Sequence, residues 1–147
     1  MYISFLLTPK QYVSYLHDTD NVEYALKKLK ESGYKEIPVL TKKGNYCGTI
    51  TEGDFLWNFM EEKITKQDKV KDLIRQNNPP IKIMETVENL MERIINCNFV
   101  PVVDDRGFFC GIVTRKNIMQ FLMKNTLSIP NKPCEMSILY SIIFLVT

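Results

Sequence analysis

The sequence has little of what enzyme active sites are commonly made from. It contains one histidine, His17, and four well-separated cysteines, without a C-x-x-C pair or a cluster of cysteine and histidine. Because protein zinc sites are built from such clusters, we expect no zinc centre. The sequence also lacks a Gly-x-x-x-x-Gly-Lys loop, a catalytic triad and a pair of acidic residues in a plausible site. These absences argue against an enzyme.

A strong excess of charge is missing as well. The formal net charge is +2, and 24% of the residues are charged, whereas proteins that bind nucleic acids usually carry a concentrated basic face. No nucleic-acid partner is therefore expected, although a small anionic ligand is compatible with this charge.

The first residues lack the basic region of a secretory signal, which favours a cytoplasmic location.

No apolar run is long enough to cross a membrane. The most apolar stretch, residues 138–146, is much shorter than the roughly 20 residues of a transmembrane helix, so no membrane partner is expected. Its residues favour β-structure, and we expect the stretch to pack against the body of the protein or against a partner subunit. A disordered or aggregation-prone end is the alternative.

What the sequence does contain is an internal repeat. The heptapeptide Gly48-Thr49-Ile50-Thr51-Glu52-Gly53-Asp54 returns in altered form as residues 111–117, with residue numbers that differ by 63. At the same offset, Pro38, Val39, Gly44, Cys47, Gly48, Thr51 and Met60 recur as Pro101, Val102, Gly107, Cys110, Gly111, Thr114 and Met123. Two copies of one unit are the simplest explanation. A chain of 147 residues can hold two such closely packed halves.

Each copy is predicted to contain a strand, a helix, two strands and a second helix, from the periodicity of its apolar residues and from its turn residues. In the first copy the strands are expected at 13–16, 36–40 and 46–50, and the helices from Val22 to a left-handed end at Gly33 and from 53 to 62. In the second copy they are expected at 81–83, 99–103 and 108–113, with helices at 87–96, ending on Asn96, and 116–124. The charged segment 61–76 is expected to be a helical connector. We expect the first repeat within residues 1–64, the connector at 65–78, the second repeat at 79–125 and a tail at 126–147.

This doubled unit resembles the CBS domain, and two units in tandem resemble the CBS pair, or Bateman module. The resemblance is carried by Ile37-Pro38-Val39 and Val100-Pro101-Val102 in the middle strands and by the Gly-h-h-Thr-x-x-Asp/Asn pattern at the end of each copy. It covers about residues 9–124. It implies an α+β (α/β) fold of two βαββα repeats with pseudo-twofold symmetry and two clefts between them for adenosine-type ligands. Small bacterial CBS pairs that bind cyclic di-AMP or other adenine nucleotides are similar to this chain.

The resemblance also implies which residues would form the two clefts. The threonine of the motif would reach phosphate or ribose and the acidic residue would hold the ribose hydroxyls, which places Thr51 and Asp54 in one site and Thr114 and Asn117 in the other. The adenine pockets would be lined by Tyr12, Val13, Ser14, Ile37, Pro38, Pro80, Ile81, Lys82, Val100 and Pro101. Arg115 and Lys116 add positive charge to the second copy.

The chemistry of these residues agrees with such a role. A carboxylate can accept hydrogen bonds from two neighbouring hydroxyls, and the start of a helix attracts a phosphate. We therefore expect Asp54 to make the first site the better ribose holder, and Arg115 with Lys116 to attract phosphate to the second. One dinucleotide spanning both sites and one mononucleotide in the first site are both compatible. A plainer interpretation of Thr51 and Asp54 is a capping box that only stabilises a helix.

The sequence favours a regulatory protein over a catalyst. The leading interpretation is a homodimeric sensor that binds AMP, ADP, ATP or cyclic di-AMP as a regulatory ligand, without a catalytic cofactor, and changes its affinity for an unidentified protein effector. The alternative is a homodimerising interaction module with vestigial nucleotide sites, which would dimerise through the helix that carries Trp57 and its counterpart around Phe121.

Overall fold

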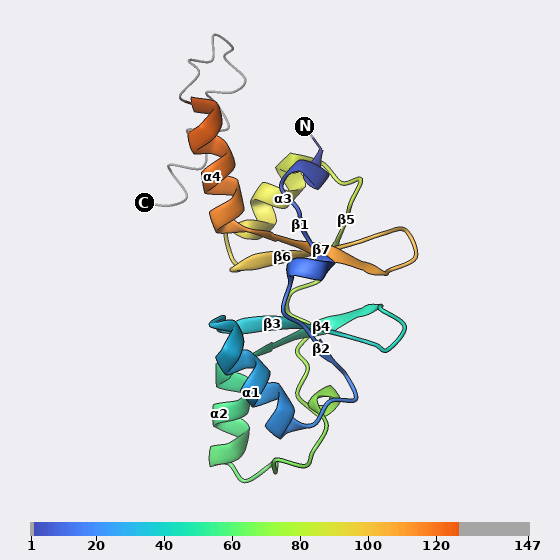
Figure 1. Cartoon of the computed structure of the whole chain (residues 1–147), viewed down its shortest axis with the longest axis vertical. Helices are drawn as coiled ribbons and strands as arrows, with labels where there is room; N and C mark the ends of the chain where they lie inside the picture. The colour runs from blue at the N-terminus through green and yellow to red at the C-terminus, as the bar shows by residue number, and fades with distance from the viewer. Residues whose placement is uncertain (1, 127–147) are drawn as a thin grey trace.

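The computed structural model describes residues 2–126 as two stacked α/β halves, whose sheets face each other and whose helices lie on the outer sides (Figure 1). The helices are α1 (Val22–Ser32), α2 (Glu52–Met60), α3 (Val87–Ile94) and α4 (Arg115–Thr126). The strands are β1 (Thr8–Pro9), β2 (Leu16–His17), β3 (Glu36–Leu40), β4 (Tyr46–Thr51), β5 (Ile81–Lys82), β6 (Phe99–Val103) and β7 (Phe109–Thr114). Three short 3₁₀ turns, η1 (Ile3–Phe5), η2 (Lys10–Tyr12) and η3 (Val70–Asp72), complete the element order. The βαββα repeat is thereby confirmed, and the expectation for residues 138–146 lies outside the described residues.

The ends of the helices follow local sequence signals in most cases. The side chain of Asn21 accepts a hydrogen bond of 2.8 Å from the Tyr24 amide at the start of α1, and Gly33 ends this helix with a φ of 72°. The prediction of a left-handed end at Asn96 is wrong, because α3 ends at Ile94 and the residue that follows it, Ile95, is right-handed. Among the described residues other than glycine, only Glu62 has a positive φ angle.

The N-terminal segment belongs to the second half of the molecule. β1 pairs antiparallel with β7, with Thr8 opposite Ile112, and the side chains of Ile3 and Leu6 are buried in the core of the second repeat. The chain then crosses to the first sheet, where β2 pairs parallel with β3. The predicted strand at 13–16 is therefore shifted to Leu16–His17, because residues 13–15 form the crossing between the halves.

The connector makes the reciprocal crossing and contains the short 3₁₀ turn η3 but no α-helix, so the predicted helical connector is wrong. The carbonyl of Asp68 accepts from the Val22 amide at 2.8 Å and that of Lys66 from the Glu23 amide at 3.1 Å. These bonds satisfy amides at the start of α1 that have no partner within the helix. Val70 and Leu73 fill the core of the first repeat, and Arg75 forms a bridge with Thr49 in β4.

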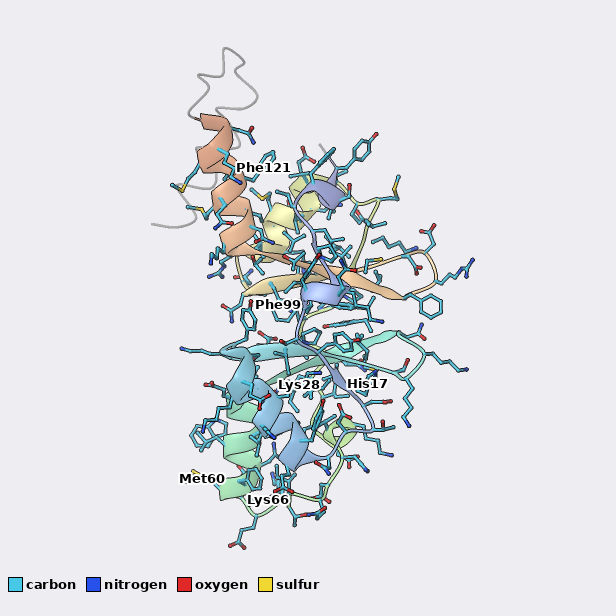
Figure 2. All side chains as sticks on the ribbon, in the orientation of Figure 1. His17, Lys28, Met60, Lys66, Phe99 and Phe121 are labelled. Atoms are coloured by element: carbon cyan, nitrogen blue, oxygen red, sulfur yellow. The ribbon has the colours of Figure 1, made fainter. Side chains whose placement is uncertain are left out.

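The two halves are related by a pseudo-twofold axis between their hairpins, as expected. The Tyr46 amide donates to the Gly107 carbonyl at 3.3 Å, and the Phe109 amide donates to the Gly44 carbonyl at 2.9 Å. Residues 46 and 109 differ by 63, as do residues 44 and 107, so exchanging the two repeats turns one bond into the other and the two bonds are symmetry mates. An apolar cluster that includes Leu40, Phe99 and Phe109 packs at this junction, and Phe99 lies on the side of its sheet that faces the other half (Figure 2).

Gly48 and Gly111 make room for the two crossing segments. A Cβ atom on Gly111 would lie 2.1 Å from the Thr8 carbonyl oxygen, and one on Gly48 would lie 2.5 Å from the Arg75 carbonyl oxygen. Both glycines also have φ angles that side chains disfavour, 149° at Gly48 and 154° at Gly111. Each glycine of the sequence motif therefore allows the segment from the other repeat to approach the strand.

We predict that Gly111→Ala destabilises the protein strongly, because β1 must move away from β7 to accommodate a methyl group. Backbone strain alone costs about 1–3 kcal/mol, which urea unfolding followed by circular dichroism would measure. Gly53→Ala is the matched control, because its Cβ would meet nothing closer than 3.7 Å within α2, and it should stabilise by about 0.5–1 kcal/mol. Equal stability of the two variants would contradict the close approach.

Candidate functional site

A cleft of about 520 Å³ opens between the two repeats. It is bordered by the crossing segment that joins β1 to β2, by the start of β3 and by the N-terminal turn of α4. The sequence-predicted residues that the structure brings together in this cleft are Tyr12, Val13, Ser14, Ile37, Pro38, Thr114, Lys116 and Asn117. Elements that are distant in the sequence thus converge on one cavity that contains both apolar and polar side chains.

Asn117 is held firmly at the edge of this cleft. Its side-chain nitrogen donates to the Thr8 hydroxyl at 2.6 Å and to the Leu6 carbonyl at 3.3 Å, while its backbone amide donates to the Thr114 hydroxyl at 3.0 Å. These donors fix the orientation of the side-chain amide. The amide oxygen accepts no hydrogen bond from the described residues, so it is available as an acceptor for a ligand hydroxyl.

The two adjacent cations of α4 have different surroundings. The Lys116 side chain borders the open cleft. The Arg115 guanidinium instead donates to the Ile94 carbonyl at 2.9 Å and to the Ile95 carbonyl at 2.7 Å. Arg115 therefore satisfies carbonyl groups at the C-terminal end of α3, which have no hydrogen-bond donors within that helix. Of the pair, Lys116 is the cation that a ligand in the open cleft would meet.

Asp54 lies outside this cleft and its carboxylate is already engaged. One oxygen accepts from the Thr51 amide at 2.8 Å, and the Thr51 hydroxyl accepts from the Asp54 amide at 3.2 Å, which completes a capping box at the start of α2. The other oxygen forms an ion pair with Arg75 of the connector, and Asp54 is 1% exposed. The plainer interpretation of these two residues is therefore realised, whereas the described contacts leave no free carboxylate oxygen for a ribose.

Arg75 was not predicted as a site residue from the sequence, although its position is equivalent to that of Thr8 in the other half. In the first repeat Arg75 lies opposite Thr49, and in the second Thr8 lies opposite Ile112, which is the equivalent strand position. The motif residues differ in the same way as their neighbours, because Thr8 accepts from the side-chain amide of Asn117 and Arg75 pairs with the Asp54 carboxylate. The crossing segment thus accounts for the asparagine in the second repeat, where it supplies Thr8 and not an arginine.

The remaining predicted residues, Ile81, Lys82, Val100 and Pro101, line neither the open cleft nor the smaller cavity at the symmetry-related position. Ile81, Val100 and Pro101 are buried and Lys82 is exposed. The cavity near this position is about 140 Å³ and is bordered by Asn78, Cys97 and Arg115 among others. The two clefts that the pseudo-symmetry provides are therefore unequal.

The described residues offer little for other chemistry. Within residues 2–126 there is no group of three or more histidine, cysteine, aspartate or glutamate side chains that could hold a metal ion. Burial raises the pKa of the Cys47, Cys97 and Cys110 thiols above the usual value, which disfavours the reactive thiolate. In the same part of the chain, every helix is too short or too polar to cross a membrane.

Comparisons with known proteins agree with this architecture. The model of the CBS domain family matches residues 9–61 and 70–124. A CBS domain-containing protein of Dictyostelium discoideum is 30% identical over 115 residues, which span 70% of this chain and 79% of that protein. Cyclic di-AMP receptor B of Bacillus subtilis is 27% identical over 122 residues, which span 80% and 83% of the two chains. The crystal structure of CbpB in complex with c-di-AMP has a TM-score of 0.80 at 27% identity and covers 84% of this chain and 85% of that one.

We predict that Asp54→Ala lowers the free energy of unfolding by about 2 kcal/mol, because it removes a helix cap and the partner of Arg75. Chemical denaturation would measure this loss. Asp68→Ala is the matched control, since the Asp68 carboxylate also accepts from the amide three residues earlier, at 2.7 Å, but at an exposed position. The control should lose about 0.5 kcal/mol or less. Similar losses in both variants would show that the ion pair of Asp54 with Arg75 contributes nothing.

Proposed function

The chain belongs to the CBS domain family and contains two CBS domains in tandem, and from this we propose that it is a regulatory module that binds an adenine nucleotide in the open cleft. The nucleotide would be a regulatory ligand, not a catalytic cofactor, and the bound state would be read by a protein effector. The observation that carries this proposal is the convergence of the crossing segment, β3 and α4 on one cavity.

Each part of the cleft suits one part of a nucleotide. The volume of about 520 Å³ is within the range of small-molecule sites. Lys116 and the first turn of α4 supply positive charge for a phosphate, and the free oxygen of Asn117 can accept from a ribose hydroxyl. Val13, Ile37 and Pro38 provide apolar surface for the base. In this assignment the main role in nucleotide binding belongs to Thr114 and Asn117, and not to Asp54, which the sequence favoured.

Cyclic di-AMP and AMP are the first ligands to test. The similarity to cyclic di-AMP receptor B and to CbpB with its bound c-di-AMP supports the cyclic dinucleotide. The cleft residues themselves suit an apolar base, a ribose and a phosphate, so AMP, ADP and ATP fit the same proposal. A cytoplasmic location, where these nucleotides occur, remains a prediction from the sequence.

We also propose that the protein is a homodimer, as the sequence suggested. An apolar groove of about 700 Å³ lies on the outer side of the first repeat, between α1 and α2. Leu56 is 52% exposed, Trp57 57% and Met60 68%, and Met60 lies at the outer end of the molecule (Figure 2). Large apolar side chains gathered on one face are typical of a protein interface. The same surface is what supports the alternative function, a dimerisation module that needs no ligand.

Thermal stability in the presence of nucleotides distinguishes the sensor from a module without a ligand. A ligand at about 100 times its dissociation constant stabilises a protein by about 2.7 kcal/mol. We expect cyclic di-AMP or an adenosine phosphate to raise the melting temperature, with GTP as the control. If no adenine ligand does so, the proposed sensor function is wrong.

For whichever ligand binds, we predict that Lys116→Ala weakens the phosphorylated form about tenfold, which corresponds to the loss of one charge-assisted hydrogen bond. Adenosine should bind the variant and the wild type alike, as measured by calorimetry. Arg115→Ala removes the neighbouring cation and is the matched control, with affinity preserved. Equal losses for adenosine and its phosphate would show that Lys116 does not contact the phosphate.

We predict that Leu56→Glu converts the dimer to a monomer, because it places a charge in the apolar groove without disturbing the core. Sedimentation velocity at micromolar concentration would show the change in mass. Met84→Glu, at a position that is 73% exposed in the second repeat, should leave the dimer intact. A monomeric wild type would refute the dimer itself.

A further inference from the structure

The pseudo-twofold axis provides two clefts, but the described structure holds one of them shut. The open cleft has a volume of about 520 Å³, and the cavity at the related position has about 140 Å³. Tyr34 borders the open cleft and is 57% exposed, whereas its counterpart 63 residues later, Cys97, is half-buried and borders the small cavity. The two clefts therefore differ in their side chains, and we call the closed one the first cleft, because Thr51 and Asp54, which correspond to Thr114 and Asn117, belong to the first repeat.

Asn78 borders the small cavity, and Arg93 contacts the side chain of Asn78. Asn78 is 4% exposed, its side-chain nitrogen donates to the Phe99 carbonyl at 3.0 Å, and its backbone carbonyl accepts from the Tyr46 hydroxyl at 2.6 Å. Arg93 reaches across from α3, where its guanidinium donates to the Asn78 side-chain oxygen at 3.4 Å and to the Pro79 carbonyl. The side-chain amide of Asn78 is thereby held on both sides, by the Phe99 carbonyl and by the Arg93 guanidinium.

The other cleft lacks such a contact because its residues differ. Leu16 and Ile81 occupy equivalent registers, opposite Val39 and Val102, so the counterpart of Asn78 is Val13, which cannot bridge to β3. By the same spacing the counterpart of Arg93 is Lys28. The Lys28 ammonium lies 5.2 Å from the centre of the Tyr15 ring, and this position leaves the cleft open.

A buried polar group without a partner occupies the strand position that corresponds, in the other repeat, to the wall of the open cleft. The Thr49 hydroxyl is buried and makes no hydrogen bond to any described residue. Its counterpart, Ile112, is part of the wall of the open cleft. A buried hydroxyl without a partner is uncommon and costs stability, and a ligand or water in an opened cleft would satisfy it.

We propose that Arg93, through its contact with Asn78 and Pro79, keeps the first cleft closed, so that each chain binds a single nucleotide and the first cleft is a latent second site. This inference rests on the proposed nucleotide binding in the open cleft. It makes Arg93 a residue that determines how many ligands the protein takes, without touching the ligand in the open cleft.

Calorimetric titration with AMP and with cyclic di-AMP tests the inference through the number of sites. The wild type should bind one equivalent per chain. Arg93→Ala should bind a second equivalent, more weakly, with the first affinity unchanged. Arg106→Ala removes an exposed arginine of the β6–β7 turn and should keep one equivalent. Two equivalents in the wild type, or one in Arg93→Ala, would overturn the proposal.

A second measurement does not need a ligand. Alkylation of Cys97, followed by mass spectrometry of its peptide, reports whether the first cleft opens, because this thiol borders the small cavity. Arg93→Ala should alkylate Cys97 at least several-fold faster than the wild type, while Cys47 and Cys110 keep their rates. An unchanged rate at Cys97 would reject Arg93 as the closing residue. If the wild type binds no nucleotide, the proposed function fails, and the alkylation rate still decides whether Arg93 closes the cleft.

Discussion

The structure depends on the exchange of one extended segment between the two repeats. β1 completes the sheet of the second repeat, and the connector completes the core of the first. Each repeat lacks part of its own apolar core, which the N-terminal segment supplies to the second repeat and the connector supplies to the first. This exchange is possible because Gly48 and Gly111 leave space for a carbonyl group where any side chain would collide with it. The halves are therefore parts of one cooperative body, which sets the width of both clefts.

The exchange also explains why two similar repeats make dissimilar sites. The residue delivered to the end of β7 is Thr8, a neutral partner that leaves the Asn117 oxygen free. The residue delivered to the end of β4 is Arg75, which consumes the carboxylate of Asp54. A carboxylate is intrinsically the stronger partner for ribose hydroxyls, but here it already serves a cap and an ion pair. The amide oxygen of Asn117 is the weaker acceptor, but it is more available to a ligand than the carboxylate of Asp54.

The sequence predicted the features that depend on local signals. The repeat, the helix that Gly33 ends, the hairpin strands and the capping box of Thr51 and Asp54 all follow from short-range patterns. The non-helical connector could not be predicted in this way, because its backbone is held by amides at the start of α1. The contacts of Arg115 with the carbonyls of Ile94 and Ile95 were hidden for a similar reason, since both depend on the packing of α4 against α3. What was missed is the long-range hydrogen bonding that only the folded topology brings together.

The position of the open cleft determines how binding can alter the protein. The cleft is bordered by the crossing segment, which is anchored in the second sheet through β1 and in the first through β2. A ligand that contacts this segment, β3 and the start of α4 adds contacts between the two halves at a place away from the hairpin junction. Such a ligand favours the arrangement in which all three contacts are made, and it shifts the equilibrium by its difference in affinity for that arrangement. Because α4 begins at the cleft and runs away from it (Figure 1), its outer end is where such a shift would be largest.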